Sequence, residues 1–215
     1  MNRVGVIVDV AHSGWQTSLD AAKVSERPIV ASRSGCAALN PHHRCKPDEV
    51  IGAIAESGGY IGICCVPAFL GGTGDIRAVL DHIDHVARNF GADHVAIGTD
   101  VAHSSSATDR EVQKIPRRRP PRSRWEGLWP PDDPVFAPEW HQEHQILSLA
   151  WTNWPLLTVG LIQRGYSDTD IQKIIGGNVL RVAREVLGTQ DHRSGGWKSR
   201  NGEACHAANA SVTDG

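Results

Sequence analysis

Short apolar runs alternate with amphipathic segments along the first half of the chain. Four of these runs are almost wholly apolar and rich in β-branched side chains, a pattern typical of strands buried on both faces of a parallel sheet. They cover residues 4–10, 28–32, 60–66 and 94–100. Apolar residues at helical spacing and helix-start signals predict helices over about 15–25, 47–57 and 75–90. The alternation predicts right-handed βαβ units around a parallel sheet.

The regular alternation ends after the fourth apolar run. Residues 104–138 are rich in Pro, Arg and Trp and have no regular period. We interpret them as a long excursion loop, or as an extended segment packed on the body of the domain. A helical pattern returns near Glu139, is interrupted at Pro155 and ends at about Gln163.

One more helix is predicted before the sequence loses its pattern. Ser167 and Asp170 have the spacing of an N-terminal capping box, and the helix that follows is expected to break or kink at Gly176–Gly177. The residues beyond it are polar, rich in Gly and aperiodic. We therefore expect one domain over residues 1–188 and a disordered tail over residues 189–215.

Composition narrows the class of protein. The chain has 22 Lys and Arg against 24 Asp and Glu, a formal charge of −2, which argues against a surface built for nucleic acid. No apolar run approaches the roughly 20 residues of a membrane-spanning helix. Met1–Arg3 lead straight into the first apolar run, without a secretory signal. We expect a cytoplasmic protein with no membrane span.

The cysteines indicate packing rather than chemistry. There are five, with Cys64 and Cys65 adjacent inside an apolar run, and no pair has C-x-x-C spacing. This excludes a zinc ribbon or a thioredoxin-type site. We expect reduced, buried thiols.

Polar side chains follow three of the predicted strands, where parallel α/β folds place their reactive groups. These residues are Asp9 and His12 after the first strand, Ser32, Arg33 and Ser34 after the second, and Asp100 and His103 after the fourth. His42, His43 and Arg44 lie in the loop after the second strand. Each residue alone is weak evidence, because polar residues are common at strand ends.

Other polar groups have simpler interpretations. The pairs His82/His85 and His141/His144 are spaced i, i+3, and we interpret both as partly solvated helix faces. The arginines of Arg117–Arg124, with Trp125 and Trp129, are interpreted as a surface strap paired with the nearby Asp132–Asp133. A nucleic-acid contact by the same arginines is a third-ranked alternative.

The order of the strand-end residues resembles the membrane dipeptidase family of metallopeptidases. The resemblance covers roughly residues 3–103 closely and residues 139–187 more loosely. The segments that carry it are Val8-Asp9-Val10-Ala11-His12-Ser13, Pro28-Ile29-Val30-Ala31-Ser32-Arg33-Ser34, His43-Arg44-Cys45-Lys46-Pro47-Asp48-Glu49, Gly58-Gly59-Tyr60-Ile61-Gly62-Ile63, Asp81-His82-Ile83-Asp84-His85, Asp93-His94-Val95-Ala96-Ile97-Gly98-Thr99-Asp100 and Ile174-Ile175-Gly176-Gly177-Asn178-Val179-Leu180-Arg181-Val182.

The resemblance implies a fold and a set of roles. The family has a (β/α)8 TIM barrel with two zinc ions at its carboxyl face, where a metal-activated water hydrolyses dipeptides or other small amides. The four strands here resemble the last four, a half barrel followed by C-terminal helices. His12 matches a zinc-binding histidine, and Arg44 matches an arginine that holds the substrate's carboxylate. Asp100 matches an aspartate that handles the proton and the substrate's amino group.

The chain departs from the family pattern in two ways. Arg33 stands where the family has a second zinc-binding histidine, and a guanidinium has no lone pair to give a metal. The family's first half, with its remaining metal ligands, is not in this sequence. A half barrel leaves open strand edges, so we expect a fragment or truncated gene product, a chain that pairs with a separate N-terminal half, or a homodimer.

Two functions follow from these residues. The first is a zinc-dependent dipeptidase-family protein that is truncated and inactive as this chain alone. The alternative is a non-catalytic protein that binds a small anionic ligand between Arg33 and Arg44.

Overall fold

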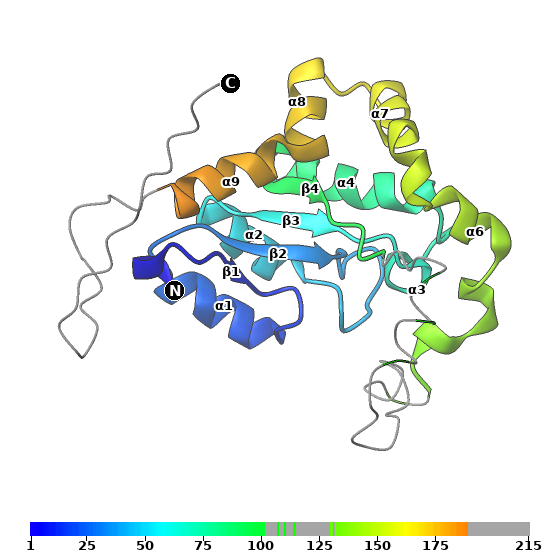
Figure 1. Cartoon of the computed structure of the whole chain (residues 1–215), viewed down its shortest axis with the longest axis horizontal. Helices are drawn as coiled ribbons and strands as arrows, with labels where there is room; N and C mark the ends of the chain where they lie inside the picture. The colour runs from blue at the N-terminus through cyan, green and yellow to red at the C-terminus, as the bar shows by residue number, and fades with distance from the viewer. Residues whose placement is uncertain (102–106, 108–109, 111–113, 115–129, 131, 189–215) are drawn as a thin grey trace, which may run out of the picture.

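The predicted parallel sheet is present, and its strands follow one another in the order β1-β2-β3-β4 (Figure 1). The structure is a computed structural model that describes residues 1–101, 107, 110, 114, 130 and 132–188. All neighbouring strands pair in parallel, so their carboxyl ends lie at one edge of the sheet. The strands are β1 (Val8–Asp9), β2 (Ile29–Ser34), β3 (Tyr60–Ile63) and β4 (Val95–Ile97).

Three of the strands are shorter than the apolar runs that predicted them. The prediction of a strand over residues 4–7 was wrong. The chain there forms the 3₁₀ turn η1 (Asn2–Val4), which is followed by Gly5 with a φ of 63°. The third run ends as a strand at Ile63 because a proline, which cannot donate to a ladder, opens helix α3 soon afterwards. Apolar content marks a buried segment more faithfully than it marks the end of a strand.

The helices agree with the periodicity, and their ends have local causes. The Asp75 side chain accepts a hydrogen bond from the Arg77 backbone at the start of α4, as an N-cap does. The helices are α1 (Trp15–Val24), α2 (Asp48–Glu56), α3 (Pro67–Leu70), α4 (Ile76–Phe90), α6 (Glu143–Ser148), α7 (Trp154–Gln163), α8 (Asp168–Gln172) and α9 (Asn178–Leu187). Short helical turns are η2 (Ala92–His94), η4 (Pro134–Phe136), η5 (Pro138–Trp140), η6 (Trp151–Asn153) and the π-helical η7 (Lys173–Gly177).

Three details of the C-terminal helices bear on the predictions. Pro155 does not interrupt a helix but lies in the first turn of α7, where its missing N–H costs nothing. The predicted kink is confirmed, because Gly176 has non-helical backbone angles between α8 and α9. The Ser167 side chain accepts a hydrogen bond from the Asp170 backbone, as the capping pattern predicted.

Helices cover both faces of the sheet, which explains why the strands are apolar on both sides. The face of β2 and β3 that presents Ile29 and Ile61 packs with residues of α1, α2 and α4 in one core cluster. The other face, which presents Val30 and Tyr60, packs against Val182 and its neighbours in α9. In Figure 1 α9 lies across the sheet on the side opposite α1 and α2.

Several sequence predictions concern the rest of the chain. Cys36, Cys45, Cys64 and Cys65 are free thiols and buried, as expected. Within the described residues, no helix has both the length and the apolar character needed to cross a bilayer. The predicted tail over 189–215, the Arg117–Arg124 segment, Trp125, Trp129 and His103 lie outside the described residues.

Candidate functional site

Four candidate residues meet at the carboxyl edge of the sheet. Arg33 Nη2 lies 3.0 Å from His12 Nε2, and Arg44 Nη2 lies 3.3 Å from the same nitrogen. Arg33 Nε lies 2.9 Å from Asp100 Oδ1. We call His12, Arg33, Arg44 and Asp100 the carboxyl-edge cluster. It joins the ends of β1, β2 and β4, as the strand-end rule predicted.

Asp9 anchors the cluster, a role that sequence reasoning missed although it noted the residue. Its Oδ1 accepts hydrogen bonds from the backbone of Ala11 and Ser32, both at 3.0 Å, and its Oδ2 accepts one from the Ser32 hydroxyl at 2.5 Å. Burial raises the pKa of Asp9, but these bonds and the nearby Arg33 outweigh it and lower the pKa. An ionised Asp9 therefore ties the end of β1 to the end of β2.

The backbone at Asp100 is unusual. Its φ is +58°, and among the described residues it is the one non-glycine residue with a positive φ. Aspartate tolerates this left-handed conformation better than most side chains do. The turn directs the Asp100 carboxylate back over the sheet edge to Arg33. Such backbone conformations are concentrated at functional sites.

His12 is held as a neutral imidazole. Burial lowers its pKa, and the charges of Arg44 and Arg33 lower it further, against the opposing effect of Asp100 and Asp9. Both guanidiniums can only donate hydrogen bonds, so His12 Nε2 must be the acceptor and Nδ1 must carry the proton.

This arrangement tests whether the residues fit the zinc ions that the resemblance implies. They do not fit. The Nε2 lone pair that would bind a metal faces two guanidinium groups. Arg33 offers no lone pair of its own and would repel a dication. The carboxylate of Asp100 is also engaged by Arg33.

Replacing Arg33 should change this result. In Arg33→His one of the two guanidiniums leaves His12 Nε2 and a second imidazole takes its place, so we expect the zinc retained after dialysis to rise above the wild-type level. Metal analysis of the dialysed chain measures it. Arg3→His, at an exposed position in η1, is the matched control and should retain no more zinc than the wild type. Equal zinc in Arg33→His and wild type would mean that the metal position is misplaced.

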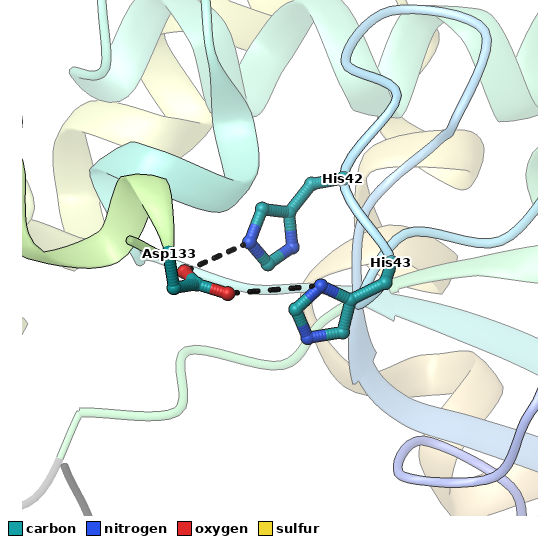
Figure 2. A group of neighbouring side chains, drawn as sticks. All are labelled: His42, His43 and Asp133. Atoms are coloured by element: carbon teal, nitrogen blue, oxygen red, sulfur yellow. Dashed lines mark hydrogen bonds and ion pairs between the residues drawn. The ribbon is translucent and has the colours of Figure 1, made fainter. Parts of the chain in front are cut away.

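A second group of side chains is formed by His42, His43 and Asp133, whose side chains point toward one another in Figure 2. His42 Nε2 is 3.3 Å from Asp133 Oδ1, and His43 Nδ1 is 3.7 Å from Asp133 Oδ2. The possible ligand atoms of His42, His43 and Asp133 all lie within 4.8 Å of one another, close enough for one metal ion. The sequence interpretation made Asp133 an ion-pair partner of the Arg117–Arg124 strap, which lies outside the described residues; in the structure its carboxylate is buried and caps η4 by accepting from the Val135 backbone.

The hydrogen bonds of this group favour a structural tie over a metal site. His42 Nδ1 accepts a bond from the Arg44 backbone at 3.1 Å. Burial lowers the pKa of His42 although Asp133 raises it, so the ring is neutral and carries its proton on Nε2, facing Asp133. A metal at Nε2 would move that proton to Nδ1, against the Arg44 N–H. As it stands, the group fastens the segment around η4 to the loop that carries Arg44.

The histidine pairs have different outcomes. The interpretation of His82 as solvated was wrong: its Nδ1 accepts from the Cys36 backbone and its Nε2 donates to the Leu70 carbonyl, both at 2.9 Å, deep inside the domain. His82 lies on the same buried face of α4 as the apolar residues, and its spacing from His85 could not reveal this. His141 and His144 are exposed, as expected, but only His144 lies in a helix, because His141 precedes α6.

Comparisons with known proteins find the family that the sequence resembles. A family model described as membrane dipeptidase (peptidase family M19) matches residues 1–117 and 150–194. "Dipeptidase tcpJ" of Claviceps purpurea is 30% identical over 189 residues, 86% of this chain and 36% of the relative. "Dipeptidase verJ" of Clonostachys rogersoniana is 29% identical over 190 residues, 86% of this chain and 39% of the relative. The chain thus spans less than two fifths of these relatives.

Solved structures give the same outline. An amidohydrolase from Pseudomonas aeruginosa matches with a TM-score of 0.64 and 26% identity, over 87% of this chain and 55% of that chain. A metallo peptidase from Rhodobacter sphaeroides, liganded with a phosphinate mimic of the dipeptide L-Ala-D-Ala, matches with a TM-score of 0.61 and 23% identity. The match covers 86% of this chain and 44% of that chain. The predicted fold class is confirmed in its coarser form, four parallel strands that match part of such barrels.

Proposed function

Because the chain belongs to the membrane dipeptidase family, peptidase family M19, we propose that its carboxyl-edge cluster binds the carboxylate of a dipeptide or a related small amide. In this proposal the chain binds such ligands without a metal and does not hydrolyse them by itself. One observation carries it: Arg33 and Arg44 both direct guanidinium nitrogens at the same face of His12.

Arg44 supplies the main contact in this proposal. It is buried, its guanidinium carbon lies 5.1 Å from the centre of the Phe69 ring, and the Ser34 hydroxyl donates to its backbone carbonyl at 2.6 Å. These contacts fix the orientation of the side chain before any ligand arrives. A guanidinium fork matches a carboxylate with two parallel hydrogen bonds.

Arg33 and Asp100 complete the site. The Arg33 and Asp100 side chains are partly exposed, at 37% and 29%, so a ligand can reach them from solvent. An anionic ligand group can share the Arg33 guanidinium with Asp100, while Asp100 can accept a hydrogen bond from the ammonium of a dipeptide. The cluster thus offers cations for the carboxylate and an anion for the amino group.

Hydrolysis needs a further component. In the family, zinc supplies an activated water that attacks the amide carbonyl. The described residues do not fit that metal, because the His12 lone pair is engaged by guanidiniums. A zinc-dependent dipeptidase therefore remains the second candidate function, one that needs metal ligands from outside the described residues.

The test is a binding titration in which glycylglycine or N-acetylglycine is added to the chain with a chelator present, and the heat of binding is measured by calorimetry. We expect both ligands to bind. Arg44→Met should weaken binding by about 10- to 100-fold, which corresponds to the free energy that hydrogen bonds to a charged group usually contribute. Arg88→Met, an exposed arginine paired with Asp84 on α4, is the control and should bind as the wild type does.

Two results would overturn the proposal. One is the absence of any binding of either carboxylate ligand to the folded wild-type chain. The other is cleavage of glycylglycine by the pure chain that appears with zinc and stops with chelator, which would favour the dipeptidase.

A further inference from the structure

A buried lysine lies beneath the carboxyl-edge cluster. Lys46 is 1% exposed, the largest of the fully buried side chains. Its Nζ donates to the Ser13 carbonyl at 2.6 Å and to the Ser18 hydroxyl at 3.2 Å. Ser13 follows His12 directly, and Ser18 lies in the first turns of α1. The side chain of Lys46 therefore reaches the loop that presents His12.

The backbone of Lys46 belongs to a different loop. Its N–H donates to the Gly35 carbonyl and its carbonyl accepts from the Ala37 N–H, both at 2.8 Å. These bonds hold Lys46 beside the end of β2, two residues after Arg44 and next to the segment that follows Arg33. Lys46 thus connects the loop after β1, which carries His12, with the end of β2, which carries Arg33, and with its own loop, which carries Arg44.

A second bond ties the same two loops. The Trp15 indole N–H donates to the Cys45 carbonyl at 2.9 Å. The Trp15–Cys45 and Lys46–Ser13 bonds are therefore two neighbouring ties, which join the segment Ser13–Trp15 at the start of α1 to the loop before α2. Two ties fix a relative orientation, whereas one would leave a hinge.

The energetics indicate that Lys46 does not serve stability. Among the described residues, no carboxylate lies within ion-pair distance of its Nζ, and its two hydrogen-bond partners, the Ser13 carbonyl and the Ser18 hydroxyl, are neutral oxygens. Burying an ammonium without a counter-ion is costly, and a buried apolar side chain of similar volume is often as stable or more so. Burial lowers the pKa of Lys46 to about 8, helped by Arg44 and opposed by Asp9 and Cys45.

We propose that Lys46 is a positioning residue for the ligand site: by holding the Ser13 carbonyl it sets His12 against Arg33 and Arg44 in the geometry that a carboxylate requires. The inference rests on the proposed function of this cluster. It adds a residue that touches no ligand and acts through the loop after β1.

The test compares Lys46→Met with Lys23→Met, the same substitution at an exposed lysine of α1. N-acetylglycine is titrated into each folded chain with chelator present. Loss of a charged donor to a backbone carbonyl predicts binding about tenfold weaker in Lys46→Met. Lys23→Met should bind as the wild type does.

A pH profile of the wild type gives a readout that a purely structural role would not move. The ammonium is lost as pH rises through about 8, which weakens its bond to Ser13, so affinity should fall several-fold between pH 7 and 9. Its charged neighbours are the Arg44 guanidinium and Asp9, whose lowered pKa keeps it ionised over that range, and burial raises the pKa of Cys45 to about 12. In Lys46→Met the profile should be flat. The wild-type profile needs no variant to fold.

Hydrogen exchange separates failure of this inference from failure of the proposed function. If the wild type binds no carboxylate, the proposed function fails, yet Lys46→Met should still speed amide exchange over residues 11–18. Equal binding in Lys46→Met and wild type, a wild-type affinity independent of pH, or unchanged exchange over residues 11–18 would each overturn the positioning role.

Discussion

Gly98→Ala should lower the free energy of unfolding by at least about 3 kcal/mol, because its new methyl group would meet backbone rather than side chain. An ideal Cβ at Gly98 lies 1.9 Å from the Ser32 carbonyl oxygen. Gly62 has the same neighbour, and a Cβ there lies 2.2 Å from that oxygen. Backbone at the centre of a sheet cannot turn aside as the end of a flexible side chain can.

Urea unfolding followed by circular dichroism measures this effect. Gly14→Ala is the matched control, because nothing lies within 4 Å of a Cβ at Gly14 and its φ is −59°. The control should lower the free energy of unfolding by no more than about 1 kcal/mol, because alanine is a poorer N-cap than glycine but meets no steric clash there. A Gly98→Ala chain that unfolds at the wild-type urea concentration would show that β2 and β4 are not as close as the structure has them.

The same glycines explain how the cluster is supported. They let β3 and β4 approach the backbone of Ser32, which directly precedes Arg33. Arg33 in turn reaches Asp100, two residues beyond Gly98. Moving Ser32 to admit a methyl group would therefore move Arg33 relative to Asp100. Any folded Gly98→Ala chain should bind a carboxylate ligand less well than the wild type.

Much of this site could be predicted from sequence, for a topological reason. The carboxyl ends of neighbouring parallel strands meet at one edge, so residues that follow separate strands, such as His12 and Arg33, must come together. The sequence could not show that both arginines would face His12 Nε2, since that depends on side-chain orientation. It could not fix the protonated nitrogen of His12 either.

Long-range contacts were the other gap. Asp133 meets His42 across 91 positions, and no local pattern relates the two. The sequence related Asp133 only to the arginines that precede it, whereas packing of Val135 in a small core beside α3 buries the Asp133 carboxylate. The burial of His82 has the same origin: the spacing of residues along α4 gives the face, but the Cys36 N–H and the Leu70 carbonyl at the end of α3, which bind its ring, are distant in the sequence.

Folding stability should fall steeply at alkaline pH, the second large effect that we predict. Burial raises the pKa of Cys45 and Cys65 to about 12 and that of Cys64 to about 11, from 9.0. Between pH 9 and 11 the unfolded chain loses these protons and the folded chain keeps them. Stability therefore decreases with pH, by about 1.4 kcal/mol per unit for each thiol once the unfolded thiols are ionised.

Lys46 should oppose this loss. Its lowered pKa of about 8 means that the folded chain has already released a proton that the unfolded chain holds up to about pH 10.5. Over that interval the unfolded state binds more protons at this site, so stability gains as pH rises. The net slope of the wild type above pH 9 should thus be smaller than the thiols alone would give.

The free energy of unfolding in urea, measured with reductant from pH 8 to 11, tests both contributions. Cys65→Ala should flatten the alkaline slope by about 1.4 kcal/mol per pH unit, whatever it costs at neutral pH, because one proton fewer is released on unfolding. Lys46→Met should steepen the slope by a similar amount below pH 10.5, because the opposing proton is gone. A wild-type stability that stays level to pH 11 would mean that water reaches the thiols, and that the core beneath the cluster is open rather than packed.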